Sequence, residues 1–487
     1  MRFRTQASAI AMLLSVTTAF AQGADPLKSA VEKAVQTNPE VSSRFHAYRA
    51  SIDAVDVARA AYFPRLDLNA SVGRDSDRIT ARSPESQTLS RNGVALSLTQ
   101  LLWDGLGTQR EVQRVGHERL TRYFELLDAT EQVALEAARA YYDVQRFRRL
   151  VQLAEDNYVQ HKYASLQIQS RFRAGVGRGV DLEQANARFA LAESNLTTEI
   201  ANLHDVTARY QRIVGEPPPA QLPALGPLVR SVPATPEDAM NAAIRQSPAV
   251  SASIEALRAA RSAAQLRQAA YQPRVEARVR SGGGNNFDGV RDQKRDSAAE
   301  LVLNWNLYNG GADQARVRQQ VNLVNQAADQ RDRACRDARQ VTAIAYNDTR
   351  KLNEQLALLD RNTLAIEKAR DAYRQQFDIG QRSLLDLLNA ENEVYTARRA
   401  YANAEYDLAL AQARTHAAMS QLTTQLGIAR HDAVASEAAG WAAGDDAPGR
   451  CPIVSSAMPS TDRGLLDERA RGMAVQAAPV PARPPAR

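Results

Sequence analysis

Two uninterrupted stretches without glycine or proline constrain this chain more than any other feature of its sequence. They run from His117 to Ala174 and from Ala312 to Ile379, which is 58 and 68 residues. Glycine and proline are the residues that interrupt helices most strongly. Each stretch can therefore form one continuous helix roughly 85–100 Å long at 1.5 Å per residue. Helices of that length exceed those of ordinary globular domains, so we expect rods that pack lengthwise against other helices.

The second stretch carries small and apolar residues at alternating spacings of three and four, interrupted by Arg331 and Arg370. The members of this seam are Val317, Val321, Val324, Ala328, Cys335, Ala338, Thr342, Ala345, Thr349, Leu352, Leu356, Leu359, Thr363, Ile366, Tyr373 and Phe377. A sustained repeat of this kind specifies helices that supercoil around one another. The many Ala and Thr residues predict a close approach of the partner helix. The edge of a large helical bundle is the alternative, and the length favours the coiled coil.

The chain also repeats itself. Two motifs recur at an offset of 209 residues and three more at an offset of 205, all in the same order. The pairs are Asn38-Pro39 with Ser247-Pro248, Tyr62-Phe63-Pro64 with Tyr271-Gln272-Pro273, Leu102-Trp103-Asp104-Gly105 with Leu307-Tyr308-Asn309-Gly310, Arg171–Gly175 with Gln376–Gly380, and Val180-Asp181-Leu182 with Leu385-Asp386-Leu387. Five ordered matches with one change in length indicate two halves of common plan.

The N-terminus has the pattern of a secretory signal. Arg2 and Arg4 precede an apolar stretch that ends at Ala19-Phe20-Ala21, which fits the small-x-small cleavage rule. No cysteine follows this site, so we expect no lipid anchor. No later stretch has the ~18 consecutive apolar residues of a membrane-spanning helix. We expect the mature chain to reach the periplasm, the outer membrane or the exterior.

The expected organisation follows from these features. We assign residues 1–21 to a signal peptide, 22–228 to a first repeat, 229–430 to a second repeat and 431–487 to a disordered tail rich in Ala, Pro and Gly. A proline-rich linker, Pro217 to Pro236, joins the repeats.

Each repeat contains two segments in which apolar and polar residues alternate, which predicts β-hairpins at about 64–104 and 273–309. The apolar positions are Leu66, Leu68, Ala70, Val72, Val94, Leu96, Leu98, Leu102, Val275, Ala277, Val279, Leu301, Leu303, Trp305 and Leu307. A single hairpin of this type is best explained as a small soluble sheet. The secretory signal, the long polar loops and strand lengths near the ~9–11 residues that cross a bilayer favour membrane strands instead.

Four strands cannot close a barrel, and open strand edges are not tolerated in lipid. Several chains must then share one barrel. Two chains give eight strands with a filled interior, and three give twelve with a polar lumen, which Asp67, Glu276, Arg278 and Arg280 would line. Trp103 and Tyr308 follow strand ends, where an interfacial aromatic girdle would lie.

The repeated Tyr-x-Pro, the Leu-Trp-Asp-Gly and Leu-Tyr-Asn-Gly motifs, and the glycine breaks Gly175–Asp181 and Gly380–Asp386 resemble those of the TolC-type outer-membrane channels. The resemblance covers about Asp25 to Arg430. It implies a mainly α-helical homotrimer with a long α-helical barrel of antiparallel coiled coils in the periplasm. A twelve-stranded β-barrel would lie in the outer membrane. It further implies a periplasmic adaptor protein and an inner-membrane ABC transporter or proton-driven pump as partners.

The same resemblance implies a gate at the inner end of the tunnel. Arg382 precedes Asp386 by four residues, as the gate arginine of the family precedes a pore aspartate, and Asp181 takes the place of the partner in the first repeat. Asn389 replaces a second pore aspartate, and Phe377 replaces an assisting tyrosine. We expect an Asp181–Arg382 bridge and one Asp386 ring, and a weaker anionic constriction than usual. The alternative is that these are solvated residues at helix starts, with aspartate as an N-cap.

No catalytic or cofactor motif is present. Gly175, Gly177 and Gly179 lack the Gly-Lys of a phosphate loop, and His117-Glu118 lacks the second histidine of a zinc protease. The formal net charge of +6 has no long basic run, so nucleic acid is not indicated. We expect no enzyme and no metal. Cys335 fits the helix seam and Cys451 lies in the expected loose tail, so we expect no disulfide between them.

These features favour a passive exit duct across the outer membrane that depends on a partner for energy. Type I protein secretion is the first expectation, and the absence of a lipid-anchor cysteine slightly favours it by family analogy. Small-molecule efflux is the alternative. A periplasmic coiled-coil structural protein without a pore is a third hypothesis.

Overall fold

The computed structural model describes residues 25–222, 232–286, 291–428, 438–451 and 462–476. The chain divides into two units, Met1–Cys451 and Pro452–Arg487. In the second unit the structure describes one helix, α10 (Arg463–Gln476). The signal peptide predicted at 1–21 lies outside the described residues.

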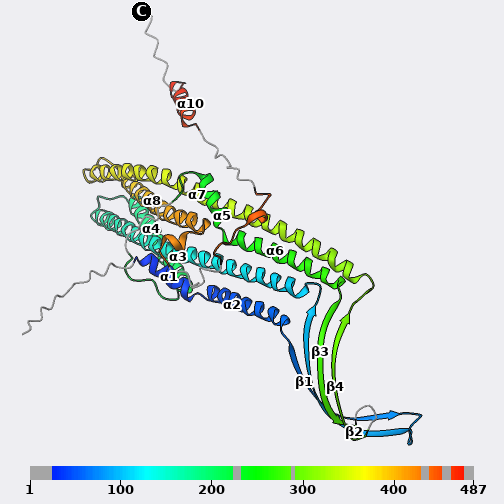
Figure 1. Cartoon of the computed structure of the whole chain (residues 1–487). Helices are drawn as coiled ribbons and strands as arrows, with labels where there is room; N and C mark the ends of the chain where they lie inside the picture. The colour runs from blue at the N-terminus through cyan, green and yellow to red at the C-terminus, as the bar shows by residue number, and fades with distance from the viewer. Residues whose placement is uncertain (1–24, 223–231, 287–290, 429–437, 452–461, 477–487) are drawn as a thin grey trace, which may run out of the picture. The chain divides into compact units, whose positions relative to one another are not determined.

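The first unit contains the same series of elements twice (Figure 1). The first series is α1 (Pro26–Thr37), α2 (Pro39–Arg59), η1 (Ala60–Tyr62), β1 (Arg65–Arg78), β2 (Ser86–Trp103), α3 (Gly107–Arg173) and α4 (Gly179–Val214). The second is α5 (Pro236–Gln246), α6 (Pro248–Gln268), η3 (Ala269–Tyr271), β3 (Arg274–Asn285), β4 (Gln293–Asn304), α7 (Ala312–Asp378) and α8 (Leu384–Ala418). Helix α9 (Leu422–Gln425) and η5 (Gly444–Asp446) follow.

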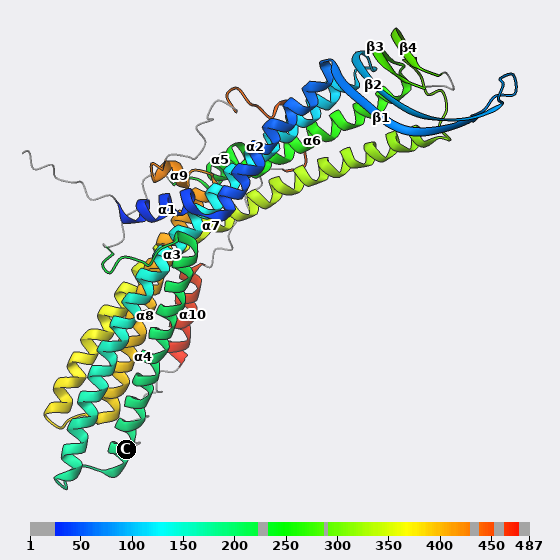
Figure 2. The ribbon, with the colours of Figure 1, turned by 90° about the horizontal axis from the view of Figure 1, so that it is seen from below.

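The two very long helices predicted from the sequence are present, and α3 and α7 each have 67 residues. Helix α3 pairs with α4, and α7 pairs with α8, as two antiparallel hairpins that lie side by side (Figure 2). Toward the strands, α2, α3, α6 and α7 form a layer in which each helix packs on the next. The repeated motifs therefore mark a real duplication.

Two of the five repeated motifs cap helices in both halves. The side chains of Asn38 and Ser247 accept hydrogen bonds from backbone N–H groups in the first turns of α2 and α6, at 2.9 and 3.3 Å, and the following prolines fit the first helical position. Asp104 accepts a bond of 2.7 Å from the backbone N–H of Thr108, at the start of α3. At the start of α7, the Asn309 amide oxygen accepts one of 3.3 Å from Asp313.

The four strands form one antiparallel sheet in the order β1-β2-β3-β4, so β1 and β4 are its edges. The register is continuous except for an irregularity between Leu101 and Trp103 in β2. Strand β4 ends at Asn304, although the alternation had extended the strand to about 309. The reason is a tertiary contact: the Trp305 Nε1–H donates to the carbonyl of Tyr271 at 3.2 Å.

The seam predicted in α7 is most deeply buried in its middle and at Phe377. Cys335, Thr342, Ala345, Thr349 and Leu352 are buried, whereas Val321 is 51% exposed. Between Leu352 and Phe377, the seam residues are half-buried and their neighbours are mostly exposed; these seam residues are Leu356, Leu359, Thr363, Ile366 and Tyr373. The coiled-coil interpretation therefore holds where α7 meets α6 and α8.

The structure differs from the sequence expectation in the tail. Residues 438–451, expected to be disordered, pack on the helical layer through Trp441, Asp446 and Arg450. Cys451 is bonded to Cys335, so the expectation of no disulfide is wrong. Composition misled the expectation, because a few specific contacts hold a segment whose only large apolar side chain is Trp441.

Candidate functional site

The sheet has one apolar face. Leu66, Leu68 and Val72 of β1 are 62%, 69% and 85% exposed, and their cross-strand partners on β2 include Leu98 and Leu96. The same face continues across β3 and β4 with Val279, Leu301 and Leu303. Exposed apolar surface of this extent indicates contact with lipid or with another protein.

The opposite face is polar and carries all four residues predicted to line a lumen. The register pairs Asp67 with Ser97 and Ser97 with Arg280, and it places Glu276 and Arg278 on the same side of β3. Glu276 accepts bonds of 2.6 Å from Arg274 and 2.7 Å from Arg278, and Arg280 pairs with Asp296 on β4. The four residues therefore share one surface and are mostly engaged in ion pairs.

Charges on this polar face balance. It carries six basic residues and six acidic ones, which are Arg65, Arg91, Arg274, Arg278, Arg280 and Lys294, and Asp67, Asp75, Asp77, Glu276, Asp296 and Glu300. A surface without net charge attracts neither sign of ion over long range. The strand residues of this face therefore supply no net charge to a pore that the face would line.

The two aromatic residues predicted at the membrane interface lie at strand ends. Trp103 is the last residue of β2 and is 44% exposed. Tyr308 lies four residues beyond β4 and is 84% exposed. Both are available to an interfacial environment, which suits aromatic rings with a polar group.

At the far ends of the helical hairpins, the two tips pack against each other. Their shared apolar core joins all four long helices and consists of Ile168, Ala185, Phe377, Leu384, Leu387 and Leu388. The guanidinium of Arg171 lies 4.9 Å from the centre of the Phe377 ring, a cation–π contact between α3 and α7. Phe377, the residue at the place of the assisting tyrosine, is therefore a packing residue in this chain.

The tip of the first hairpin turns on glycines. Gly175 has a φ of +75°, and a Cβ added at Gly177 would lie 2.8 Å from the backbone nitrogen of Phe172. Helix α4 begins after this turn without a side-chain cap, and Asp181 lies in its first turn. A carboxylate there is favoured by the positive end of the helix dipole.

The tip of the second hairpin is capped by side chains. The Ser383 hydroxyl accepts a bond of 3.2 Å from the backbone N–H of Asp386 and donates one of 2.9 Å to its carboxylate. Arg382 lies 3.7 Å from Asp386, donates to Gln376 at 3.0 Å and stacks 4.8 Å from the centre of the Tyr373 ring. Ser383 is thus the N-cap of α8, and Asp386, in the first turn of that helix, is the partner of Arg382.

The structure brings together only some of the predicted gate residues. Arg382 and Asp386 form a pair, but within the described part of one chain no ion pair joins Arg382 to Asp181. Asn389 accepts a bond of 3.0 Å from Arg188, which ties α8 to α4. The predicted bridge therefore requires a second chain or a different arrangement of the tips.

Sequence reasoning missed a buried acid behind the second tip. Glu391 on α8 is 8% exposed and pairs with Arg370 at 3.1 Å and Arg374 at 2.5 Å, both on α7. The seam analysis had noted Arg370 only as an interruption. The spacing of four between the two arginines was the available signal, because it places both on one helix face.

His161 on α3 lies beside this cluster and is 3% exposed. Its Nδ1 lies 2.9 Å from the carbonyl oxygen of Asn157. Burial lowers the pKa of His161 below the ordinary histidine value. The hydrogen bond to the Asn157 carbonyl and the charge of Glu391 oppose this shift, and the charge of Arg188 adds to it.

Over the described residues, no group of acidic, histidine or cysteine side chains is arranged to hold a metal ion. A search of the same residues finds no helix with the length and apolar character to cross a bilayer.

Comparison with known proteins gives a consistent result. The family model described as outer membrane efflux protein matches residues 30–216 and 239–421, one match for each repeat. The chain is 25% identical over 425 residues to the outer membrane efflux protein BepC of Brucella suis, which covers 86% of this chain and 91% of that protein. It is 25% identical over 421 residues to the alkaline protease secretion protein AprF of Pseudomonas aeruginosa, covering 83% and 85%.

Solved structures have the same fold. The outer-membrane channel OprN superposes with a TM-score of 0.72 at 20% identity, over 81% of this chain and 90% of that one. The CmeC outer membrane channel of Campylobacter jejuni gives a TM-score of 0.72 at 15% identity, over 82% and 86%.

Proposed function

Because the chain belongs to the outer membrane efflux protein family, we propose that three copies assemble into an exit duct that crosses the outer membrane and the periplasm. In this assembly the apolar face of each four-stranded sheet meets lipid and the polar face lines the pore. The helical hairpins form the tunnel below. The two-faced sheet with its open edges is the observation that carries the proposal.

The two open edges of the sheet require further copies of the chain in the membrane. Strands β1 and β4 have unpaired backbone groups along their outer sides, and such groups are costly in lipid. Pairing β4 of one copy with β1 of the next removes every edge when the ring closes. Three copies of four strands give a twelve-stranded barrel whose interior is wider than side chains can fill.

We further propose that the tips form the gate. Arg382 and Asp181 lie on neighbouring hairpins and are not paired within one chain, so their bridge would form between copies in the closed state. Since Asn389 carries no charge, Asp386 supplies the single anionic ring. The balanced charges of the barrel face leave this ring as the main source of cation preference.

For the cargo, type I protein secretion is our first proposal and small-molecule efflux the second. The similarity to AprF, a protease secretion protein, supports secretion, and the equal identity to BepC, an efflux protein, supports the alternative. Either function needs a periplasmic adaptor and an inner-membrane ABC transporter or proton-driven pump, since the sequence carries no nucleotide-binding loop.

Planar-bilayer recording from the purified full chain tests the duct. We expect a heat-modifiable trimer from outer-membrane fractions with discrete, weakly cation-preferring conductance steps. A trimer that never conducts would leave the structural coiled-coil hypothesis in its place. Deletion of the gene separates the cargoes: loss of one secreted protein with unchanged drug sensitivity supports secretion, and the reverse pattern supports efflux.

A further inference from the structure

Residues 438–451, which we call the strap, cross three helices of the layer near its middle. The Trp441 ring packs 4.9 Å from the Phe124 ring on α3, and its Nε1–H donates to Glu255 on α6 at 2.7 Å. The backbone carbonyl of Asp446 accepts a bond of 3.0 Å from Arg331 on α7. One short segment thus contacts α3, α6 and α7 in turn.

The strap is held by a buried polar network. The Glu255 side chain is fully buried and accepts bonds of 2.7 Å from Trp441 and from Arg258, with the His117 ring nitrogen also at 2.7 Å. Arg258 in turn donates to the Asp446 carboxylate at 2.8 Å and to the carbonyls of Ala442 and Ala443. Burial of Glu255 acts to raise its pKa, but the hydrogen bonds from His117, Trp441 and Arg258 outweigh burial and the pKa is lowered. Removing the strap would leave this buried carboxylate with fewer donors.

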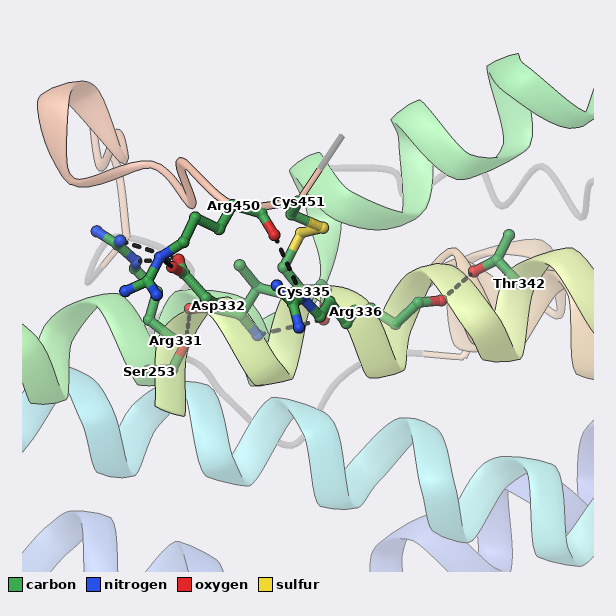
Figure 3. The surroundings of a disulfide bond; sticks show 11 residues. Ser253, Arg331, Asp332, Cys335, Arg336, Thr342, Arg450 and Cys451 are labelled. Atoms are coloured by element: carbon green, nitrogen blue, oxygen red, sulfur yellow. Dashed lines mark hydrogen bonds and ion pairs between the residues drawn. A yellow bond between two sulfur atoms is a disulfide. The ribbon is translucent and has the colours of Figure 1, made fainter. Parts of the chain in front are cut away.

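The end of the strap is attached covalently (Figure 3). Cys451 is bonded to Cys335 of α7, which is 1% exposed. Arg450 lies beside it and forms ion pairs with Asp332 at 3.0 Å and with Asp329 at 2.8 Å. Figure 3 shows the Arg450 carbonyl pointing to Arg336, whose Nε donates to it at 3.3 Å. Charged groups of α7 therefore align the strap next to the sulfur atoms.

The disulfide closes a large loop of the chain. Cys335 and Cys451 are 116 residues apart, and the loop between them contains the rest of α7 and all of α8 and α9. The bond therefore closes the base of the second hairpin. The first hairpin has no such closure, because the chain contains only these two cysteines.

We propose that residues 438–451 are a redox-dependent strap, whose disulfide fixes the base of the α7–α8 hairpin to the helical layer. The strap is released when a dithiol reduces this bond to two cysteine thiols and itself becomes a disulfide. Formation removes two protons and two electrons from the two thiols. The acceptor is the disulfide of an oxidising dithiol protein, which becomes a dithiol through exchange. A secreted chain meets such proteins in the oxidising periplasm.

Two measurements on the full chain test the strap. Alkylation in denaturant should add no label to protein isolated without reductant and two labels after reduction. Hydrogen exchange of the folded protein should then show amides of 438–451 exchanging at least tenfold faster after reduction, with unchanged exchange in the first hairpin tip around Gly175. The Cys451→Ser variant should match the reduced wild-type protein.

Reduction after folding keeps the test valid if Cys451→Ser fails to fold. A matched variant, Trp441→Phe, retains the disulfide and an aromatic ring but removes the N–H that donates to Glu255. It should accelerate amide hydrogen exchange in the strap less than reduction does. Two labels without reduction, or strap exchange that reduction leaves unchanged, would overturn the proposal. Neither alkylation nor hydrogen exchange depends on ion conduction by the protein. The strap proposal can therefore hold even if bilayer recordings contradict the duct.

Discussion

The long helices of the two repeats have the same length and very different surroundings. Helix α3 buries 25 of its 67 residues, because it packs on α2, α4, α6 and α8 as well as α1. Helix α7, also 67 residues long, buries nine. Duplication therefore produced one interior helix and one edge helix. The edge helix is the one to which the strap is disulfide-bonded.

We expect the largest effect from a charge introduced on the edge helix α7. Val341 and Ile344 of α7 are 55% and 47% exposed in the single chain. If they meet another copy, Val341→Asp buries an unpaired carboxylate at a cost of several kcal/mol, and we expect loss of the heat-modifiable trimer on gels. Val341→Ala should retain the trimer. A stable trimer in the aspartate variant would show that these residues do not lie at an interface.

The interior helix should respond to loss of volume without any change in charge. Leu150 of α3 is 2% exposed and packs in a cluster with Leu153, Tyr395 and Ala402. Leu150→Ala should destabilise the fold by about 2–5 kcal/mol, measured as a lower midpoint of thermal unfolding by circular dichroism. Leu358→Ala on α7, which is 42% exposed, is the matched control and should have a much smaller effect on the unassembled chain. Equal losses would contradict the contrast between the helices.

The sequence alone could predict some features of this molecule and not others. Helix lengths, the duplication and the two-faced strands depend on local patterns, so they were predictable residue by residue. The family resemblance added the identity of the fold, which the comparisons confirm.

The strap and the Glu391 cluster were not predictable in this way. Each joins residues far apart in the chain: Cys335 meets Cys451, and Glu391 meets Arg370 and Arg374 across two helices. The spacing of residues along a helix predicts which of them share a face, but it does not predict which residue of another segment they contact. The end of β4 was missed for a similar reason, because the Trp305 bond to Tyr271 is a tertiary contact.

The two tips allow a sharper comparison at the proposed gate. Arg382 of the second tip pairs with Asp386, whereas Arg178 of the first tip, which is likewise exposed, forms no ion pair with any described residue. Three exposed pairs contribute at most about 3 kcal/mol together, enough to shift a two-state equilibrium. We expect Arg382→Ser to raise single-channel conductance severalfold in planar bilayers, and Arg178→Ser to change it little. Unchanged conductance in the Arg382 variant would remove that residue from the gate.

The smallest expected effect is a dependence of folding stability on pH. It compares a buried histidine of the first hairpin with an exposed one. His161 is buried, with Arg188 of α4 and Glu391 of α8 as its charged neighbours, and its pKa is lowered. As pH falls through about 6.5, the unfolded chain takes up a proton that the folded chain still excludes. Folding stability contributed by this group is therefore present at neutral pH and declines on acidification.

The size of this decline is bounded by linkage. One pH unit below the ordinary histidine pKa corresponds to at most ~1.4 kcal/mol. The difference between unfolding midpoints at pH 7.5 and 5.5 should shrink when His161 is replaced by Gln, which keeps polarity but cannot titrate. His204, whose side chain is 83% exposed on α4, provides the control, and His204→Gln should leave the difference unchanged. A change of equal size in the two variants would mean that burial of His161 is not what links pH to stability in this hairpin.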